Sequence, residues 1–270
     1  MLLCALRVSA AASLPPPHVH HLRSRALHAT RTIRVWVPPD LPRGARCDVL
    51  YLNDGQNLFG DGDRDSGGGG WKADATAARL IHDRVIPPLI IVGLDNAGDH
   101  ARGVDYLPVP DAFEAHPDPP GADRYLDFVI DEAVPFVNRH YPTKTGPAHT
   151  GFGGSSYGAV SAFYAAMAHP GVFGRLLLES PSVGVGGGVL LERARAVKRW
   201  PGRIVMGVGT GEGRSGRGPN LAFETLVGIL RGAGLGDDRL KVTVQDGARH
   251  NEAAWASRLP DDLAFLFGQD

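Results

Sequence analysis

The chain has 270 residues, enough to bury the core of one large domain. Its 28 basic and 29 acidic residues are interspersed and give a formal net charge of -1, which excludes nucleic acid or an anionic membrane surface as the main partner. No run approaches the ~20 apolar residues that a membrane span requires. The two cysteines, Cys4 and Cys47, form neither a metal-binding spacing nor a disulfide framework, so they are compatible with a reducing compartment.

The N-terminal segment has no clear fold pattern. Residues 1–13 are apolar enough to suggest a signal peptide, but Arg7 interrupts the run and no basic segment precedes it; we expect a cytoplasmic protein, with secretion as the alternative. We expect residues 1–21 to form a poorly ordered arm and residues 22–270 to form a single domain. No carboxylate or cysteine lies at ligand spacing from the nearby histidines, so we expect no metal site among His18, His20, His21 and His28.

From about residue 32 onward the chain alternates between strand and helix patterns. Apolar runs predict strands at 33–37, 48–52, 89–94, 149–153, 175–179, 204–208 and 241–245. Helical periodicity predicts helices at 73–84, 122–139, 159–168, 190–200 and 223–232. This alternation is typical of an α/β domain, with a mostly parallel central sheet flanked by helices on both faces.

The segment Gly154-Ser155-Ser156-Tyr157-Gly158 lies between a predicted strand and a predicted helix. It matches G-x-S-x-G, the nucleophile elbow of α/β-hydrolases, in which a sharp turn exposes a serine. Glycines there let the strand and helix approach closely around a strained serine backbone. A match of five residues is weak alone, and a turn that only caps the helix is the alternative. The strand-turn-helix context favours Ser156 as a nucleophile.

Polar residues follow two late strands of the predicted sheet. Glu212 comes after the strand at 204–208, and His250 comes after the strand at 241–245. Sites in parallel sheets lie beyond the carboxyl ends of the strands. Ser156, Glu212 and His250 therefore have the chain order nucleophile, acid and base of an α/β-hydrolase triad, in which the imidazole activates the serine and the carboxylate orients the imidazole. The alternatives for the acid are Glu179 and Asp246.

An early strand end and the elbow supply candidates for an oxyanion hole. Gly55 allows the backbone to bend after the strand at 48–52, so the N–H of Gln56 can point inward, and the N–H of Tyr157 follows the nucleophile. An ordinary Asp-Gly turn is the alternative. A Pro-rich loop over residues 107–121 is long enough to act as a lid. Candidate substrate-binding side chains, each with a purely structural role as the alternative, are Trp71, Arg102, Tyr106 and Trp255.

A family resemblance is carried by the strings RTIRVWVPP, YLNDGQNLF, PPLIIVGLDN, HTGFGGSSYGAVSAFYAAMAHPGVFG, ESPSV and ARHNEAAWASRLP. Together, over about residues 22–268, they resemble the putative esterase family, which includes enterochelin-esterase-like and esterase D-like α/β-hydrolases. The resemblance implies a serine hydrolase with Ser156, His250 and Glu212 as its triad and with Gln56 and Tyr157 as its oxyanion donors. Relatives usually carry Met at the position of Tyr157 and Gly at that of Ala159, which leaves the substrate class open.

We therefore expect an α/β-hydrolase fold and a serine carboxylic-ester hydrolase that forms an acyl-enzyme without metal or organic cofactor. Its partner is expected to be a small-molecule ester: an acetylated sugar, a feruloyl ester, a siderophore ester or a simple short-chain ester. The alternatives are an acyltransferase with the same triad and a non-catalytic binding protein with this fold. The sequence does not indicate an oligomeric state.

Overall fold

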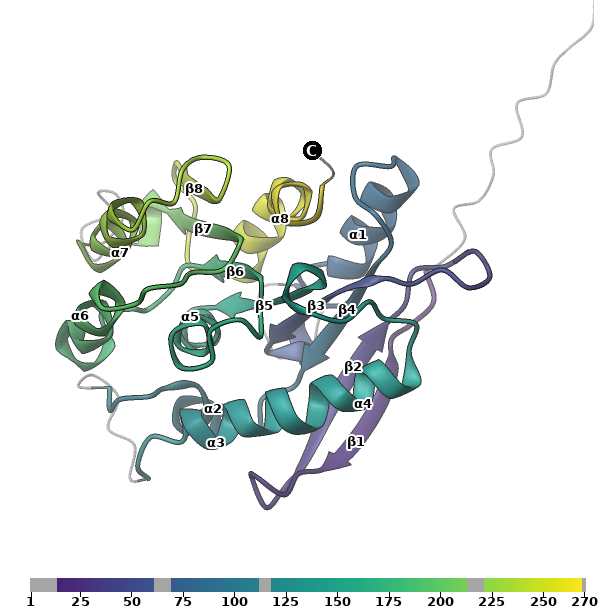
Figure 1. Ribbon diagram of the computed structural model, residues 1–270, viewed down its shortest axis with the longest axis horizontal. Coiled ribbons are helices and arrows are strands. Elements are labelled where there is room, and N and C mark those ends of the chain that lie inside the picture. The colour runs from purple at the N-terminus through teal and green to yellow at the C-terminus, as the bar shows by residue number, and fades with distance from the viewer. Residues whose placement is uncertain (1–13, 61–68, 112–117, 213–220, 269–270) are drawn as a thin grey trace, which may run out of the picture.

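An eight-stranded sheet forms the centre of the computed structural model, which describes residues 14–60, 69–111, 118–212 and 221–268 (Figure 1). The strand order across the sheet is β1-β2-β4-β3-β5-β6-β7-β8. The strands are β1 (His18–Arg23), β2 (Thr30–Trp36), β3 (Asp48–Asn53), β4 (Leu89–Leu94), β5 (Thr150–Ser155), β6 (Arg175–Glu179), β7 (Arg203–Gly209) and β8 (Leu240–Gln245).

The sheet is mostly parallel, as predicted. β1 pairs antiparallel with β2, and β2 pairs antiparallel with β4; every pairing from β4 across to β8 is parallel. All residues of β3, β4 and β5 are buried, which explains their nearly continuous apolar sequences. Because these strands run in the same direction, their carboxyl ends lie at one edge of the sheet.

Helices cover both faces of the sheet, and the two layers are separate in Figure 1. On one face, α1 (Ala73–His82) and α8 (Glu252–Phe267) pack together over an apolar layer that includes Leu52 and Leu263. The opposite face contains the larger core, which includes Phe152 and Phe163. Its helices are α2 (Asp99–Tyr106), α3 (Ala122–Asp127), α4 (Val134–His140), α5 (Tyr157–Ala168), α6 (Val189–Arg195) and α7 (Leu221–Gly232).

The predicted helix at 122–139 is present but contains a change in geometry. α3 continues through a π-helical segment, Phe128–Ala133, into α4. Pro135 lies at the start of α4 and has no N–H to donate to the preceding turn. A π-type turn immediately before a proline accommodates that missing donor. Two helices, α2 and α8, were not among the predicted elements.

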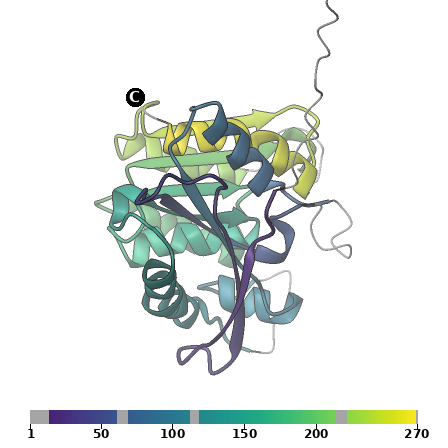
Figure 2. The same ribbon diagram turned by 90° about the vertical axis from the view of Figure 1, so that its right-hand side faces the viewer.

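The N-terminal prediction is wrong for the residues after position 17. Residues His18–Arg23 form β1, which pairs with β2 along its whole length, so the expected arm over residues 1–21 is ordered from His18. In Figure 2 the purple N-terminal strands are the part of the sheet that reaches furthest down the view. It is held by His20, whose Nε2 lies 2.6 Å from the Tyr141 hydroxyl and whose ring packs edge-on against Phe136. Residues 1–13, including the signal-peptide candidate and Cys4, lie outside the described residues.

Within the described ranges, no helix combines the length and the apolar character needed to cross a membrane. Over the same ranges, no group of three or more His, Cys, Asp or Glu side chains is arranged to hold a metal ion. Cys47 is buried beside the sheet, and burial raises the pKa of its thiol to about 11. A thiol with a raised pKa is a poor nucleophile, so this cysteine is a packing residue.

Candidate active site

Ser156 lies at a sharp turn between β5 and α5. Its backbone has φ 55° and ψ -119°, a conformation that is strained for a residue with a side chain. The surrounding glycines are required for space: a Cβ on Gly153 would lie 2.5 Å from the Leu177 carbonyl oxygen, and one on Gly158 would lie 3.0 Å from Asn53 Cβ. The predicted strand-elbow-helix arrangement is therefore present, with the serine at its apex.

Glu212 and His250 come together at the carboxyl edge of the sheet. Glu212 ends a short 3-10 helix, Thr210–Glu212, that follows β7, and His250 lies in the segment after β8. His250 Nδ1 lies 2.9 Å from Glu212 Oε2. The Glu212 side chain is 8% exposed and that of His250 is 42% exposed, so the carboxylate is shielded while the imidazole is accessible. This contact orients the ring and leaves Nε2 for a partner on the other side.

Further hydrogen bonds hold the Glu212 carboxylate. Its Oε1 accepts the Ser180 hydroxyl at 2.8 Å and the Gly209 N–H at 2.7 Å. Burial acts to raise the pKa of Glu212, but the hydrogen bonds from His250, Ser180 and Gly209 outweigh it and hold the pKa below its ordinary value. The side chain is therefore ionised at neutral pH, as a group that orients an imidazole must be.

A tryptophan supports both members of the pair. The Trp255 indole N–H donates to Ser180 Oγ at 2.8 Å, and the His250 ring packs edge-on against the Trp255 ring with centroids 5.2 Å apart. Trp255 lies in the first turn of α8, so this helix, absent from the predicted elements, positions the imidazole. The signal missed in the sequence is the segment Asn251-Glu252, in which the Asn251 side chain accepts the Ala254 N–H and caps α8.

The two alternative acids lie elsewhere. Glu179 is buried under α8, where its carboxylate accepts two N–H groups of Arg258, one of them Nε at 2.9 Å from Oε2. Asp246 accepts the Thr210 hydroxyl at 3.0 Å. Of the three carboxylates considered in the sequence, Glu212 is the one that contacts His250.

The Ser156 hydroxyl has a neighbour that the sequence did not predict. Its Oγ lies 3.2 Å from Ser182 Oγ, and the Ser182 N–H donates to the Ser156 carbonyl at 3.4 Å. Among the hydrogen bonds of the described residues, none joins Ser156 Oγ to His250. A hydrogen bond between nucleophile and base is often long until the substrate complex forms. The structure thus brings Glu212 to His250, whereas the Ser156 hydroxyl contacts Ser182.

The turn after β3 is packed against the start of α5. Asp54 has a left-handed backbone, φ 59° and ψ 48°, and the 3-10 turn Gly55–Asn57 follows it. Only glycine fits at position 55, because a Cβ there would lie 2.6 Å from the Gly93 carbonyl carbon. Asn53 Nδ2 donates to the Gly158 carbonyl at 2.8 Å, which joins this turn to the elbow. Gln56 and Tyr157, the predicted oxyanion donors, therefore belong to two segments in contact.

A cavity of about 460 Å³ opens beside the elbow. Three of the four candidate substrate-binding side chains line it: Trp71, Arg102 and Trp255. Tyr106 does not, because it is fully buried and its hydroxyl accepts the Asp54 N–H at 3.2 Å, so the prediction that it contacts substrate is wrong in this structure. The remaining lining residues are mostly polar: Asp54, Gln56, Asn57, Asn96, Gly98, Asp99, Ser155 and Glu252.

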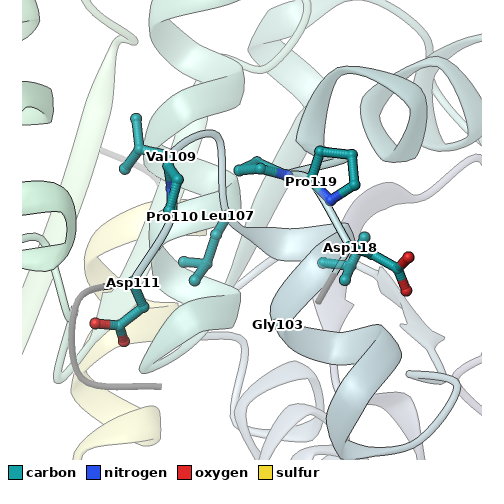
Figure 3. A pocket seen from close by; sticks show the side chains of 9 residues that line it. Gly103, Leu107, Val109, Pro110, Asp111, Asp118 and Pro119 are labelled. Atoms are coloured by element: carbon teal, nitrogen blue, oxygen red, sulfur yellow. The ribbon is translucent and has the colours of Figure 1, made fainter. Parts of the chain in front are cut away.

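A second cavity of about 330 Å³ lies between α2 and the chain that follows it (Figure 3). It is lined by Gly103, Val104, Leu107, Val109, Pro110, Asp111, Asp118, Pro119 and Pro120. It is connected to the elbow through Asp111, whose carboxylate accepts the Tyr157 hydroxyl. The predicted lid covers residues 107–121, but residues 112–117 lie outside the described residues.

The sequence profile of the family described as "Putative esterase" matches residues 24–266. The chain belongs to the putative esterase family. This esterase is accordingly a carboxylic-ester hydrolase, and its mostly parallel sheet with helices on both faces is an α/β-hydrolase fold.

The esterase is also similar to individual proteins. It is 21% identical over 255 residues to the "Uncharacterized protein YbbA" of Bacillus subtilis strain 168, covering 89% of this chain and 94% of the relative. The siderophore hydrolase EstB from Aspergillus nidulans matches with a TM-score of 0.73 and 21% identity over 97% of this chain and 98% of the other. The enterobactin esterase FES from Shigella flexneri matches with a TM-score of 0.73 and 22% identity, over 93% of this chain and 58% of that protein. At these identities the structural matches show a shared fold.

Proposed function

We propose that this esterase is a serine hydrolase that cleaves its ester through a covalent acyl-enzyme. The observation that carries the proposal is the hydrogen bond between His250 and Glu212 at the same sheet edge where the strained elbow presents Ser156. A serine hydroxyl is a poor nucleophile until a neutral imidazole accepts its proton, and a buried carboxylate keeps the imidazole in one tautomer. These are the three parts of an acyl-transfer site.

In the proposed reaction, Ser156 Oγ attacks the ester carbonyl carbon while His250 Nε2 takes the hydroxyl proton. The tetrahedral intermediate then collapses: the bond from carbon to the alcohol oxygen breaks, and His250 returns the proton to the departing alcohol. Water attacks the acyl-enzyme with His250 again accepting a proton, and the carboxylic acid leaves as Ser156 regains its hydrogen. Glu212 orients His250 and stabilises the imidazolium in both steps, and no cofactor is needed.

Two backbone N–H groups are proposed to bind the oxyanion. Tyr157 is the first residue of α5, and N–H groups in the first turn of a helix point out of its end, where they favour negative charge. Gln56 lies in the turn packed against that helix end. Donors of this kind act on the charge that develops in the transition state, and losing one typically costs about 10²–10³ in kcat.

The substrate is proposed to be a small or medium ester with a polar part, since the cavity beside the elbow has carboxylates and amides alongside Trp71 and Trp255. Two structural relatives are named for siderophores or enterobactin, which supports a siderophore ester as one candidate. Acetylated sugars, feruloyl esters and simple short-chain esters are the others.

The proposal is tested by release of p-nitrophenol from acetyl, butyryl and octanoyl esters, with burst kinetics at high enzyme concentration. Wild type should show a burst and turnover, whereas Ser156→Ala should show no burst and should lose nearly all turnover. Ser161→Ala is the matched control, because Ser161 lies in the same helix and its buried hydroxyl has no hydrogen-bond partner among the residues that the structure describes. Equal rates for wild type and Ser156→Ala would overturn the proposal.

A further inference from the structure

Arg102 bridges the two segments that carry the proposed oxyanion donors. On one side its Nε and Nη2 donate to the two carboxylate oxygens of Asp54, each at 2.8 Å. On the other side Nη2 lies 3.4 Å from the carbonyl oxygen of Ser155, the elbow residue directly before Ser156. Its guanidinium also lies over the Tyr157 ring, 5.5 Å from the centroid. One side chain in α2 therefore contacts both the turn after β3 and the start of α5.

The turn on the Asp54 side needs such support. Asp54 has a positive φ that favours glycine or asparagine, so its backbone conformation persists only where the surroundings fix it. Its residue is 7% exposed, and Asn96 Nδ2 also donates to Oδ1 at 2.6 Å. Both carboxylate oxygens thus have donors, and the planar guanidinium supplies a bidentate contact that fixes direction as well as distance.

The Arg102 charge is already paired inside the protein. Burial acts to lower the pKa of Arg102, but the ion pair and hydrogen bonds with Asp54 outweigh burial and raise it. The side chain is 21% exposed and lines the cavity, and its Nε and Nη2 groups donate to the Asp54 carboxylate. Because the guanidinium charge is already paired with Asp54, Arg102 is better suited to hold two protein segments together than to bind an anionic substrate.

We propose that Arg102 is a positioning residue that fixes the spacing between the Gln56 and Tyr157 N–H groups by clamping Asp54 to the elbow. This inference rests on the proposed serine-hydrolase function. It assigns Arg102 a role that differs from the direct substrate contact expected from the sequence. Because oxyanion donors act over distances of about 2.7–3.1 Å, a small displacement of either segment weakens transition-state binding more than ground-state binding.

The test is steady-state kinetics on the neutral ester p-nitrophenyl acetate with Arg102→Ala, Arg102→Lys and Asp54→Asn. We expect Arg102→Ala to lower kcat by about 10²-fold while KM changes less than about threefold. Arg102→Lys, which keeps the charge but not the bidentate contact, should fall between that variant and wild type. Arg31→Ala is the matched control: it removes the ion pair of Arg31 with Asp105, also on α2, at 2.7 Å and with side chains 11% and 10% exposed.

The outcomes separate the alternatives. If Arg102→Ala raised KM and left kcat unchanged, Arg102 would be a substrate-binding residue and the proposed positioning role would be overturned. An equal loss of kcat in Arg102→Ala and Arg31→Ala would overturn it as well. The double variant Asp54→Asn/Arg102→Ala should be about as slow as the slower single variant, since both remove one contact; multiplied losses would contradict the proposal. Thermal melting shows whether each variant is folded. If Arg102→Ala does not fold, the kcat and KM of Arg102→Lys test the proposal instead. Absence of wild-type turnover would overturn the proposed function itself, whereas turnover that depends on Ser156 but not on Arg102 overturns the clamp alone.

Discussion

Trp255 and Ser180 are 75 positions apart in the chain, and the Trp255 indole N–H donates to Ser180 Oγ at 2.8 Å. The same Ser180 hydroxyl donates to Glu212 at 2.8 Å. Helix α8 is therefore linked through one hydroxyl to the carboxylate that contacts His250. Ser180, which forms both of these hydrogen bonds, has a positive φ of 45°.

Ser180→Ala should weaken catalysis without abolishing it. The change removes one donor to Glu212 and leaves the Trp255 N–H without its acceptor, while the His250 and Gly209 contacts remain. We expect kcat to fall by about 5- to 30-fold, equivalent to about 1–2 kcal/mol for a buried hydrogen bond. The measurement is kcat on p-nitrophenyl acetate, with Ser161→Ala as the control. Unchanged kcat would show that Ser180 does not help to orient the carboxylate.

Glu212→Gln should lower kcat strongly while the protein stays folded. The amide has one acceptor oxygen where the carboxylate has two, so it cannot accept from Ser180, Gly209 and His250 at once, and it carries no charge to stabilise an imidazolium. We expect a loss of about 10²–10⁴ in kcat, measured at neutral pH beside circular dichroism to establish folding. Activity close to wild type would mean that another group supplies the acid.

Glu179→Gln should lower the stability of the fold and leave kcat nearly unchanged, the reverse of the result expected for Glu212→Gln. Glu179 and Arg258 form an ion pair with side chains 1% and 3% exposed, so changing one partner leaves an uncompensated buried charge. Breaking such a pair typically costs about 3–5 kcal/mol of unfolding free energy. Urea unfolding should show this loss, whereas kcat per folded molecule should remain within about threefold of wild type. A large loss of kcat in a folded Glu179→Gln protein would return Glu179 to the list of candidate acids.

The sequence indicated the fold well where patterns were local. Buried strands such as β4 are continuous apolar runs, and the elbow is a contiguous motif. β1 was missed because an edge strand with histidines at positions 18, 20 and 21 lacks an apolar period, and its order depends on β2 and Tyr141. α8 was missed because its first turn reads as part of the His250 loop and Pro260 interrupts the helical pattern.

The candidate site was predictable where strand ends determine its residues, and not where it depends on contacts between residues far apart in the chain. Ser156, Glu212 and His250 each follow a strand, so the topology of a parallel sheet brings them to one edge. The contact of Ser182 with Ser156 joins residues 26 positions apart, and that of Asp54 with Arg102 joins residues 48 positions apart. No sequence periodicity predicts contacts of this kind. Tyr106 was assigned to the pocket from its place in the chain, but its side chain points into the core.

Glu212 should also make the folded protein sensitive to acid. Its pKa is held below the ordinary value for a glutamate by its hydrogen bonds, so the stability that they contribute is fully present above the unfolded pKa and is lost as pH falls through the folded pKa. Urea unfolding between about pH 3 and pH 6 should therefore show a larger loss for wild type than for Glu212→Gln. Parallel curves for the two proteins would contradict this contribution.

Gly209→Ala should displace the loop that carries His250. A Cβ at this position would lie 2.1 Å from the Ala248 carbonyl oxygen, a backbone atom that cannot rotate away as a side chain could. The same glycine donates its N–H to Glu212, so a shift of either segment changes the contact between Glu212 and His250. Misplacement of reacting groups by about 1 Å costs about 10² in rate, and we expect a fall in kcat of that order.

Gly228→Ala is the matched control, because nothing lies within 4 Å of a Cβ at that position in α7. Replacing glycine by alanine inside a helix is expected to raise the unfolding free energy by up to about 1 kcal/mol and to leave kcat unchanged. Thermal melting and kcat are measured for both variants. If Gly209→Ala retained full activity, the loop at Ala248 would have to move without moving His250, and the close approach of β7 to that loop would not be needed to position the base.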